Sequence, residues 1–211
     1  MSKSLAILGA GGHGKVVADA ARATGDWEHI FFFDDSYPCR EQSGDWKIVG
    51  NFSDLLDSHS TYDGIFVAIG CNKARLEWFN KLKEKGAHIV SICHPAAVIS
   101  PSASIQDGCV VCALAVVNPD AIIGYACIIN TGAIVEHDCV LNEGVHLSPN
   151  ATLAGAAKVG SCSWIGVGAV TKQQIDIGSN AIVGAGAVVI DSVPDNVVVA
   201  GVPAKTVQTL C

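Results

Sequence analysis

One histidine in the C-terminal half of the chain, His137, has the side chain and the setting of a proton acceptor. An amine or hydroxyl that attacks a thioester must lose a proton, and imidazole, with an unperturbed pKa of about 6.5, can accept that proton at neutral pH. Of the seven histidines, only His137 and His146 lie in the repetitive segment described below. His137 is therefore the candidate general base, and a surface histidine without a role is the alternative.

A second group of residues near the N-terminus is suited to binding phosphate. The segment Gly9-Ala10-Gly11-Gly12-His13-Gly14 fits the spacing G-x-G-x-x-G, and Asp34 follows Gly14 by 20 residues. Glycines let backbone amides approach a phosphate at a helix N-terminus, so NAD and a UDP-sugar would both satisfy the motif. Asp34 and Asp35 would lie at the carboxyl end of a strand, where open parallel sheets bind ligands. A tight turn without a ligand, and solvated loop acids, remain alternatives.

The elements around these residues predict a Rossmann-like β-α-β-α-β domain with a parallel sheet, from residue 1 to about 95. A helical pattern covers residues 15–21, and Gly70-Cys71-Asn72 follows the third expected strand. Loop signals occur at Pro38, Gly44 and Asn51, and His94-Pro95 marks the passage to the next domain. The expected strands are Leu5 to Leu8, Ile30 to Phe33, Gly64 to Ile69 and Ala87 to Ile92.

Residues 96–211 contain a repeat of six. Stepping by six from Ile99 to Val189 meets an aliphatic residue at every position except Thr171, and the position two residues earlier is nearly always small. A period of six fits neither 3.6 nor 3.5, so the segment from about Ala97 to Val193 is a β-solenoid in which each hexad is one short strand and a turn. Cys109, Cys127 and Cys139 fall in the small column, where they are expected to act as small core residues.

Composition limits the possible partners and the location. With 13 Lys and Arg and a net charge of -7, a nucleic-acid binder is not expected. The chain shows no signal-peptide pattern and no apolar run of about 18 residues, so we expect no membrane insertion. The nine cysteines are an odd number, which favours free thiols in a reducing cytoplasm over a disulfide framework.

The combination of Gly-Ala-Gly-Gly-His-Gly with the later segment Asn130-Thr131-Gly132-Ala133-Ile134-Val135-Glu136-His137-Asp138-Cys139, and the ending Gly201-Val202-Pro203-Ala204-Lys205, resembles sugar O- and N-acyltransferases of the sialic acid O-acetyltransferase type. Within them it is most similar to the UDP-4-amino-sugar N-acetyltransferases of the bacillosamine pathway. The resemblance implies a left-handed parallel β-helix with three faces, in which three hexads make one coil. It also implies a homotrimer with active sites between subunits, and acetyl-CoA as the co-substrate.

The resemblance also implies roles for individual residues. His137 would be the general base, Asp138 its polar neighbour, and Asn130 and His146 would shape the site. The expected nucleotide-sugar contacts are Gly11, Gly12, His13, Asp34, Asp35, Gly70, Asn72 and Asn130.

The expected donor site follows from a coil of three hexads. Asn130, Ser148, Gly166 and Gly184 would stack, as would His137 and Gly155. We expect Gly155, Gly166 and Gly184 to form one bare strip below His137, along which a pantetheine arm lies and whose backbone N–H groups stabilise the oxyanion. Glycines that merely suit solenoid corners are the alternative. The expected cofactor contacts are His146, Gly155, Gly166, Val167, Gly184 and Ala185.

Taken together, these features predict an acetyl-CoA-dependent N-acetyltransferase acting on the 4-amino group of a UDP-linked amino-deoxy sugar in bacterial glycan biosynthesis. The nearest alternatives are a sugar O-acetyltransferase and an N-acetyltransferase for a GDP-linked amino sugar. A non-catalytic scaffold and a γ-class carbonic anhydrase, which uses three metal-binding histidines, are more distant ones. His137 and His146 are too far apart in the sequence to show a zinc spacing, so no metal is expected.

Overall fold

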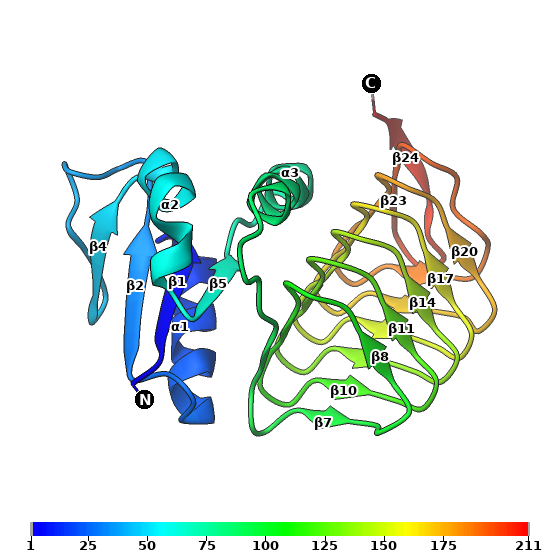
Figure 1. Ribbon diagram of the computed structural model, residues 1–211. Coiled ribbons are helices and arrows are strands. Elements are labelled where there is room, and N and C mark those ends of the chain that lie inside the picture. Colours follow the sequence, from blue (N-terminus) through cyan, green and yellow to red (C-terminus); the bar gives the residue numbers. More distant parts are fainter. Residues whose placement is uncertain (1, 211) are drawn as a thin grey trace. The chain divides into compact units, whose positions relative to one another are not determined.

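The computed structural model describes residues 2–210 and divides into two compact units, residues 1–95 and residues 96–211 (Figure 1). None of its helices, over the residues described, has the length and apolar character needed to cross a membrane.

The first unit is built on a five-stranded sheet with the order β3-β4-β2-β1-β5. The strand β1 lies in the middle and pairs in parallel with both β2 and β5, while β2 pairs in parallel with β4 and the short β3 is antiparallel at the edge. The carboxyl ends of β1, β2 and β5 therefore meet at one edge of the sheet. The predicted parallel Rossmann-like sheet is confirmed. The strands are β1 (Ser4–Leu8), β2 (His29–Phe33), β3 (Gln42–Ser43), β4 (Trp46–Gly50) and β5 (Gly64–Val67).

Three α-helices and a short 3-10 helix complete this unit, with α1 and α2 on opposite faces of the sheet (Figure 1). The helix α2 begins with a capping box, in which the Asn51 side chain accepts from the backbone N–H of Asp54 and the Asp54 side chain accepts from that of Asn51. By contrast, α1 and α3 begin at Gly11 and Cys71 without a side-chain cap. The helices are α1 (Gly12–Thr24), α2 (Phe52–Ser58), η1 (His59–Thr61) and α3 (Asn72–Glu84).

One prediction for this unit was wrong. The fourth strand, expected over Ala87 to Ile92, is reduced to a single bridge between Ile89 and Ile65, followed by β6 (Ile92–Cys93). The segment between Asp34 and β5, where loop signals occur at Pro38, Gly44 and Asn51, contains α2 and also the β3–β4 hairpin, which was not predicted. The turn signals themselves were correct, because Gly44 has a φ of 61° in the hairpin and Asn51 caps α2. The elements between them are too short to show a period.

The second unit is a left-handed parallel β-helix, as predicted. Each strand from β10 to β19 pairs in parallel with the third strand before it and the third strand after it, as Val116 does with Val98 and Ile134, so three hexads make one coil with three faces. Face 1 contains β7, β10, β13, β16, β19 and β22; face 2 contains β8, β11, β14, β17 and β20; face 3 contains β9, β12, β15, β18, β21, β23 and β24. The strands are β7 (Val98–Ile99), β8 (Ser104–Ile105), β9 (Val110–Val111), β10 (Val116–Val117), β11 (Ile122–Ile123), β12 (Ile128–Ile129), β13 (Ile134–Val135), β14 (Val140–Leu141), β15 (His146–Leu147), β16 (Thr152–Leu153), β17 (Lys158–Val159), β18 (Trp164–Ile165), β19 (Val170–Thr171), β20 (Asp176–Ile177), β21 (Ile182–Val183), β22 (Val188–Val189), β23 (Val197–Ala200) and β24 (Lys205–Thr209).

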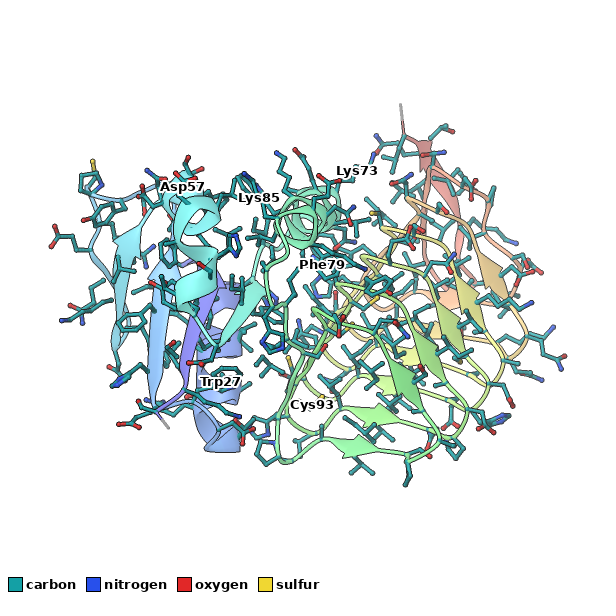
Figure 2. All side chains as sticks on the ribbon, viewed as in Figure 1. Trp27, Asp57, Lys73, Phe79, Lys85 and Cys93 are labelled. Carbon is teal, nitrogen blue, oxygen red and sulfur yellow. The ribbon has the colours of Figure 1, made fainter. Side chains whose placement is uncertain are left out.

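The corners and the interior explain the six-residue period. From Gly108 to Gly186 every sixth residue has a positive φ, including Asp138 at 60°, because each corner needs one residue in the left-handed region. Side chains of the two predicted inward columns fill the interior of the coils (Figure 2). Cys109, Cys127 and Cys139 are fully buried there, which confirms them as core residues.

Candidate active site

His137 lies at the corner between faces 1 and 2, in the turn that joins β13 to β14. Its side chain is exposed, and its Nδ1 lies 2.7 Å from Oδ2 of Asp138. The hydrogen bond to Asp138 is the main reason why the pKa of His137 is raised above its usual value, with further contributions from the charges of Asp138 and Glu136. Because Asp138 occupies the left-handed corner position, the turn itself holds the carboxylate beside Nδ1 and leaves Nε2 directed away from it.

Gly155 lies one coil further on, directly against the ring of His137. A Cβ at residue 155 would be 2.6 Å from Nε2 and 2.7 Å from Cε1 of His137. The backbone does not need glycine here, because the same corner position in other hexads carries Tyr125, Ser161 or Val167. Gly155 therefore makes room for the imidazole.

An apolar groove of about 360 Å³ lies on face 3, at its corner with face 1. It contains four of the predicted cofactor contacts, Gly166, Val167, Gly184 and Ala185. It also contains four residues that were not predicted to belong to the donor site. These are Ser148, Trp164, Ile182 and Val183. A signal for one of them was present, since Trp164 is the only tryptophan after residue 95.

The expected strip of Gly155, Gly166 and Gly184 below His137 is wrong for a single chain. Gly155 stacks on His137 at the corner of faces 1 and 2, whereas Gly166 and Gly184 lie at the corner of faces 3 and 1. A Cβ on Gly166 would be 2.6 Å from the backbone nitrogen of Ala185, and one on Gly184 would be 3.0 Å from Cβ of Ala200. These two glycines are thus also required for coil stacking, as the alternative held.

His146 and Asn130 lie on the coils next to this groove. His146 is only 8% exposed, and its ring stacks on Trp164 with the centroids 5.0 Å apart. Nε2 of His146 lies 3.2 Å from Nδ2 of Asn130. The indole Nε1 of Trp164 donates to Oγ of Ser148 at 2.6 Å. The four side chains form one connected cluster at the end of the groove.

In the first unit, some glycines of the turn after β1 are needed for close packing, whereas others have open space beside them. A Cβ on Gly9 would be 2.8 Å from the carbonyl oxygen of Ala68, and one on Gly14 would meet the carbonyl of Gly9, so both glycines allow close packing. A Cβ on Gly11 or Gly12 would meet nothing within 4 Å, and the same is true of Gly70 after β5. The open glycines leave backbone accessible at the carboxyl edge of the sheet.

The two predicted acids behave differently. Asp34 accepts from the backbone N–H of Ala10 at 2.8 Å and from both the N–H and the hydroxyl of Ser36. Partial burial would raise the pKa of Asp34, but the hydrogen bonds from Ser36 and Ala10 outweigh it and the pKa is lowered. Asp34 therefore also braces the glycine turn. Asp35 is exposed and accepts from the backbone N–H of Phe52 at 3.2 Å.

A buried polar cluster lies beneath the turns that begin α1 and α3. Arg75 is fully buried and donates to the carbonyls of Ile69 and Gly70 and to Oδ1 of Asn72. Burial, and secondarily the charge of Arg75, lowers the pKa of His13 to about 4. Nε2 of His13 is buried without a hydrogen-bond partner. A buried ring nitrogen without a partner is unusual, and it lies at the edge where open parallel sheets bind ligands. Over residues 2–210 no group of three or more His, Cys, Asp and Glu side chains could hold a metal ion.

Comparison with known proteins places the chain in a family. Residues 4–82 match the family model described as the PglD N-terminal domain. The chain is 41% identical to the acetyltransferase domain of PglB from Neisseria gonorrhoeae FA1090, solved with acetyl coenzyme A, over 98% of this chain and 100% of that one, with a TM-score of 0.94. The chain belongs to the family of sugar acetyltransferases with a PglD N-terminal domain. As such it is an acyltransferase, and the family resemblance predicted from its motifs is confirmed.

Two further relatives show the range of this acetyltransferase family. A variant of perosamine N-acetyltransferase from Caulobacter crescentus, solved with CoA and GDP-perosamine, is 39% identical over 97% of each chain, with a TM-score of 0.92. The UDP-N-acetylbacillosamine N-acetyltransferase of Bacillus subtilis is 39% identical over 117 residues, which are 53% of this chain and 52% of that protein. The alignment thus spans about half the length of that curated relative.

Proposed function

We propose that this acyltransferase transfers the acetyl group of acetyl-CoA to the 4-amino group of a UDP-linked amino-deoxy sugar, with His137 as the general base. The observation that carries the proposal is the pairing of His137 with Asp138. The imidazole of His137 lies against Gly155, and its Nε2 is turned away from the Asp138 carboxylate. The relatives of C. crescentus and B. subtilis are also N-acetyltransferases.

The proposed reaction is direct attack without a covalent enzyme intermediate. The amine nitrogen forms a bond to the thioester carbonyl carbon while Nε2 of His137 takes a proton from the nitrogen. The Nδ1–H of the resulting imidazolium donates to Asp138, which stabilises the positive charge. The C–S bond then breaks, and the CoA thiolate leaves and takes up the proton that His137 holds. The products are the amide and free CoA.

The apolar groove is the proposed donor site. An acyl-CoA has a long, narrow pantetheine arm, and the groove is lined almost entirely by apolar side chains and glycine backbone from two successive coils. The polar cluster of Asn130, His146 and Ser148 lies at one end of it.

The distance between base and groove supports an active site shared by two copies of the chain. They lie at opposite edges of face 1, a full hexad apart, and six extended residues span about 20 Å. The outward column of face 1 is β-branched throughout, whereas that of face 2 includes Ser104, Lys158 and Asp176. A second copy packed on face 1 would cover this outward column and bring the corner that carries its groove to His137 of the first copy. The residues of the column, here called the stripe, are Val98, Val116, Ile134, Thr152, Val170 and Val188.

A cyclic homotrimer fixes which end of the groove meets the base. His137 and His146 belong to the same coil, residues 134–151. Rotation about an axis parallel to the solenoid keeps heights unchanged, so His137 of one subunit would arrive at the height of His146 of the next. We therefore place the thioester at the His146 end of the groove and the rest of the pantetheine arm toward Ile182.

The first unit is the proposed nucleotide-sugar domain. The uncapped N-termini of α1 and α3 lie at the same edge of the sheet, with open backbone at Gly11, Gly12 and Gly70. This arrangement suits a diphosphate, and the partnerless Nε2 of His13 suits a further polar contact. A GDP-linked sugar is the second candidate, because GDP-perosamine is bound to the C. crescentus relative. We expect the protein to act in the cytoplasm, where acetyl-CoA and reduced thiols are found.

The substrate is tested by incubating the protein with acetyl-CoA and UDP- or GDP-linked 4-amino sugars, each beside its 4-hydroxy counterpart, and following thiol release. We expect turnover with the UDP-linked amine and a loss of about 10²-fold or more in His137→Ala. Turnover with only the GDP-linked sugar would replace the nucleotide assignment, and turnover with only the hydroxyl would replace the amine.

The shared site is tested by mixing two inactive variants. His137→Ala lacks the base, and Ala185→Trp fills the groove at an exposed corner position. If base and groove come from different subunits, trimers refolded from an equal mixture would recover about a quarter of the wild-type activity, since one interface in four pairs an intact base with an intact groove. No recovery in trimers of confirmed mixed composition would place both in one chain.

A further inference from the structure

The tryptophan of the β-helix is held in place on two sides. The Trp164 side chain is outward on β18 and 39% exposed, and it forms part of the groove. One side of its ring stacks on His146, with an angle of 23° between the ring planes. Its Nε1 donates to Oγ of Ser148 at 2.6 Å, which fixes the indole in its own plane. Trp164 is thus both a groove residue and one face of the His146 site.

The hydrogen bonds of Asn130 indicate whether Nε2 of His146 donates or accepts. Oδ1 of Asn130 accepts from the backbone N–H of Thr131 at 2.9 Å, so the amide nitrogen Nδ2 faces Nε2 of His146. An amide nitrogen can only donate, and Nε2 must therefore accept. A proton on Nε2 would set two donors against each other at 3.2 Å, so this contact favours a ring whose Nε2 accepts.

We propose that Trp164 is a positioning residue for acyl transfer, which fixes the plane of the His146 ring and, through that ring, the place of the donor thioester. The inference rests on the proposed donor groove. Asn130 contacts one atom of the imidazole, whereas the indole stacks on the face of the ring and so fixes its plane. The hydrogen bond to Ser148 holds the indole itself in place. Trp164 thereby orders the end of the groove that the base reaches.

Three variants separate the parts of this arrangement. Trp164→Leu removes the stacked ring, Trp164→Phe keeps a stacking ring without the N–H donor, and Ser148→Ala keeps the indole without its acceptor. We expect kcat to fall about 10- to 100-fold in Trp164→Leu, as for an active-site group misplaced by about 1 Å, with the KM for acetyl-CoA changed less than about threefold. Trp164→Phe should recover most of the lost kcat, and Ser148→Ala should lose about two- to fivefold.

Outcomes that overturn the inference are specific. A rise in the KM for acetyl-CoA with unchanged kcat would make Trp164 a groove wall only. Equal losses in Trp164→Phe and Trp164→Leu would remove the role of stacking. If Trp164→Leu fails to fold, the test rests on Ser148→Ala, and a wild-type kcat in that variant would refute positioning through the indole.

Intrinsic fluorescence distinguishes a failure of this inference from a failure of the donor groove. Binding of CoA, followed in parallel by calorimetry, should change the tryptophan emission of the wild type and of Trp46→Phe, whose indole lies in the first unit. It should not change that of Trp164→Phe. Calorimetric binding without any emission change in the wild type would mean that CoA lies elsewhere, which refutes the donor groove and with it this inference. An emission change with unaltered kcat in Trp164→Leu would refute the inference alone.

Discussion

Replacing Gly155 by alanine should disturb the proposed base without disturbing the fold. The new Cβ would be 2.6 Å from Nε2 of His137, and ordinary contact begins at 3.4 Å, so the imidazole must move by about 0.8 Å. The neighbouring atoms are the end of an exposed side chain, which can move at little cost. The position has no positive φ and accepts larger residues in other hexads. The strain therefore falls on the His137 ring alone.

The expected magnitudes follow from that displacement. A misplacement of about 1 Å at a reacting group costs on the order of 10²-fold in rate, so kcat for thiol release should fall about 10- to 100-fold in Gly155→Ala. The free energy of unfolding should rise by about 0.4–1 kcal/mol, because alanine restricts the unfolded chain at a site where its backbone is already compatible. Activity and stability would move in opposite directions, which a general structural defect cannot produce.

The control is a double-mutant cycle with His137→Ala. In that background the space beside residue 155 is empty, and the added methyl should leave the residual activity unchanged while retaining its stabilising effect. Thermal unfolding and steady-state kinetics on the four proteins suffice. Wild-type kcat in Gly155→Ala, or the same fold-loss with and without His137, would refute the assignment of Gly155 as the space for the base.

Three other predictions test single features of the two units. The value of kcat/KM should rise with pH as His137 loses its proton, with a midpoint above 6.5. The hydrogen bond from His137 to Asp138 is the main cause of the raised pKa, so Asp138→Asn should move this rise to lower pH. A pH profile that is unchanged in Asp138→Asn would contradict that cause. His13, with a pKa of about 4 in the folded protein and about 6.5 unfolded, stabilises the fold above pH 6.5, and this contribution is lost as the pH falls toward 4. Between pH 7 and pH 4 the free energy of unfolding, measured with urea, should therefore fall by about 2–3 kcal/mol more in the wild type than in His13→Gln. An equal fall in the two proteins would argue against burial of a neutral His13 ring. Asn51→Ala should lower the free energy of unfolding by about 1 kcal/mol, because it removes the capping box of α2. Asp57→Ala, on the same helix but without a capping role (Figure 2), should lower it by less than about 0.5 kcal/mol. Equal losses in the two variants would refute the stabilising role of the cap.

The sequence predicted most of the β-helix because each hexad is itself one strand and one corner. The period therefore reports the three-dimensional repeat directly, and the inward columns could be listed residue by residue. In the first unit the strands β1 and β5 are buried on both faces and form continuous apolar runs, which are easily seen. The hairpin β3–β4 and the helix α2 have neither a long run nor a clear period, so only their boundary residues Gly44 and Asn51 gave a signal.

The candidate site was predicted less completely, for a reason of geometry. Residues that share a column lie whole coils of three hexads apart, whereas Gly155 and Gly166 are separated by less than two hexads, so they cannot share a column. The same arithmetic would have paired Trp164 with His146, which are one full coil apart. Column positions could be worked out from the sequence, but the stacking of the two rings and the bond from Trp164 to Ser148 depend on side-chain orientations that a repeat does not encode.

If copies of the chain associate through face 1 as proposed, that face has two linked roles. Its outward β-branched column is an apolar stripe that water solvates poorly, and association of copies would remove it from solvent. The same association would bring the corner that carries the groove of one copy to the corner that carries His137 of another, since these two corners lie on either side of the stripe. An isolated chain would then hold every catalytic group in the correct local geometry and still lack a site. On this view the hexapeptide repeat does more than stack a core, because its uniform coil height allows a base and a donor groove on different corners to meet at the same level in the next subunit.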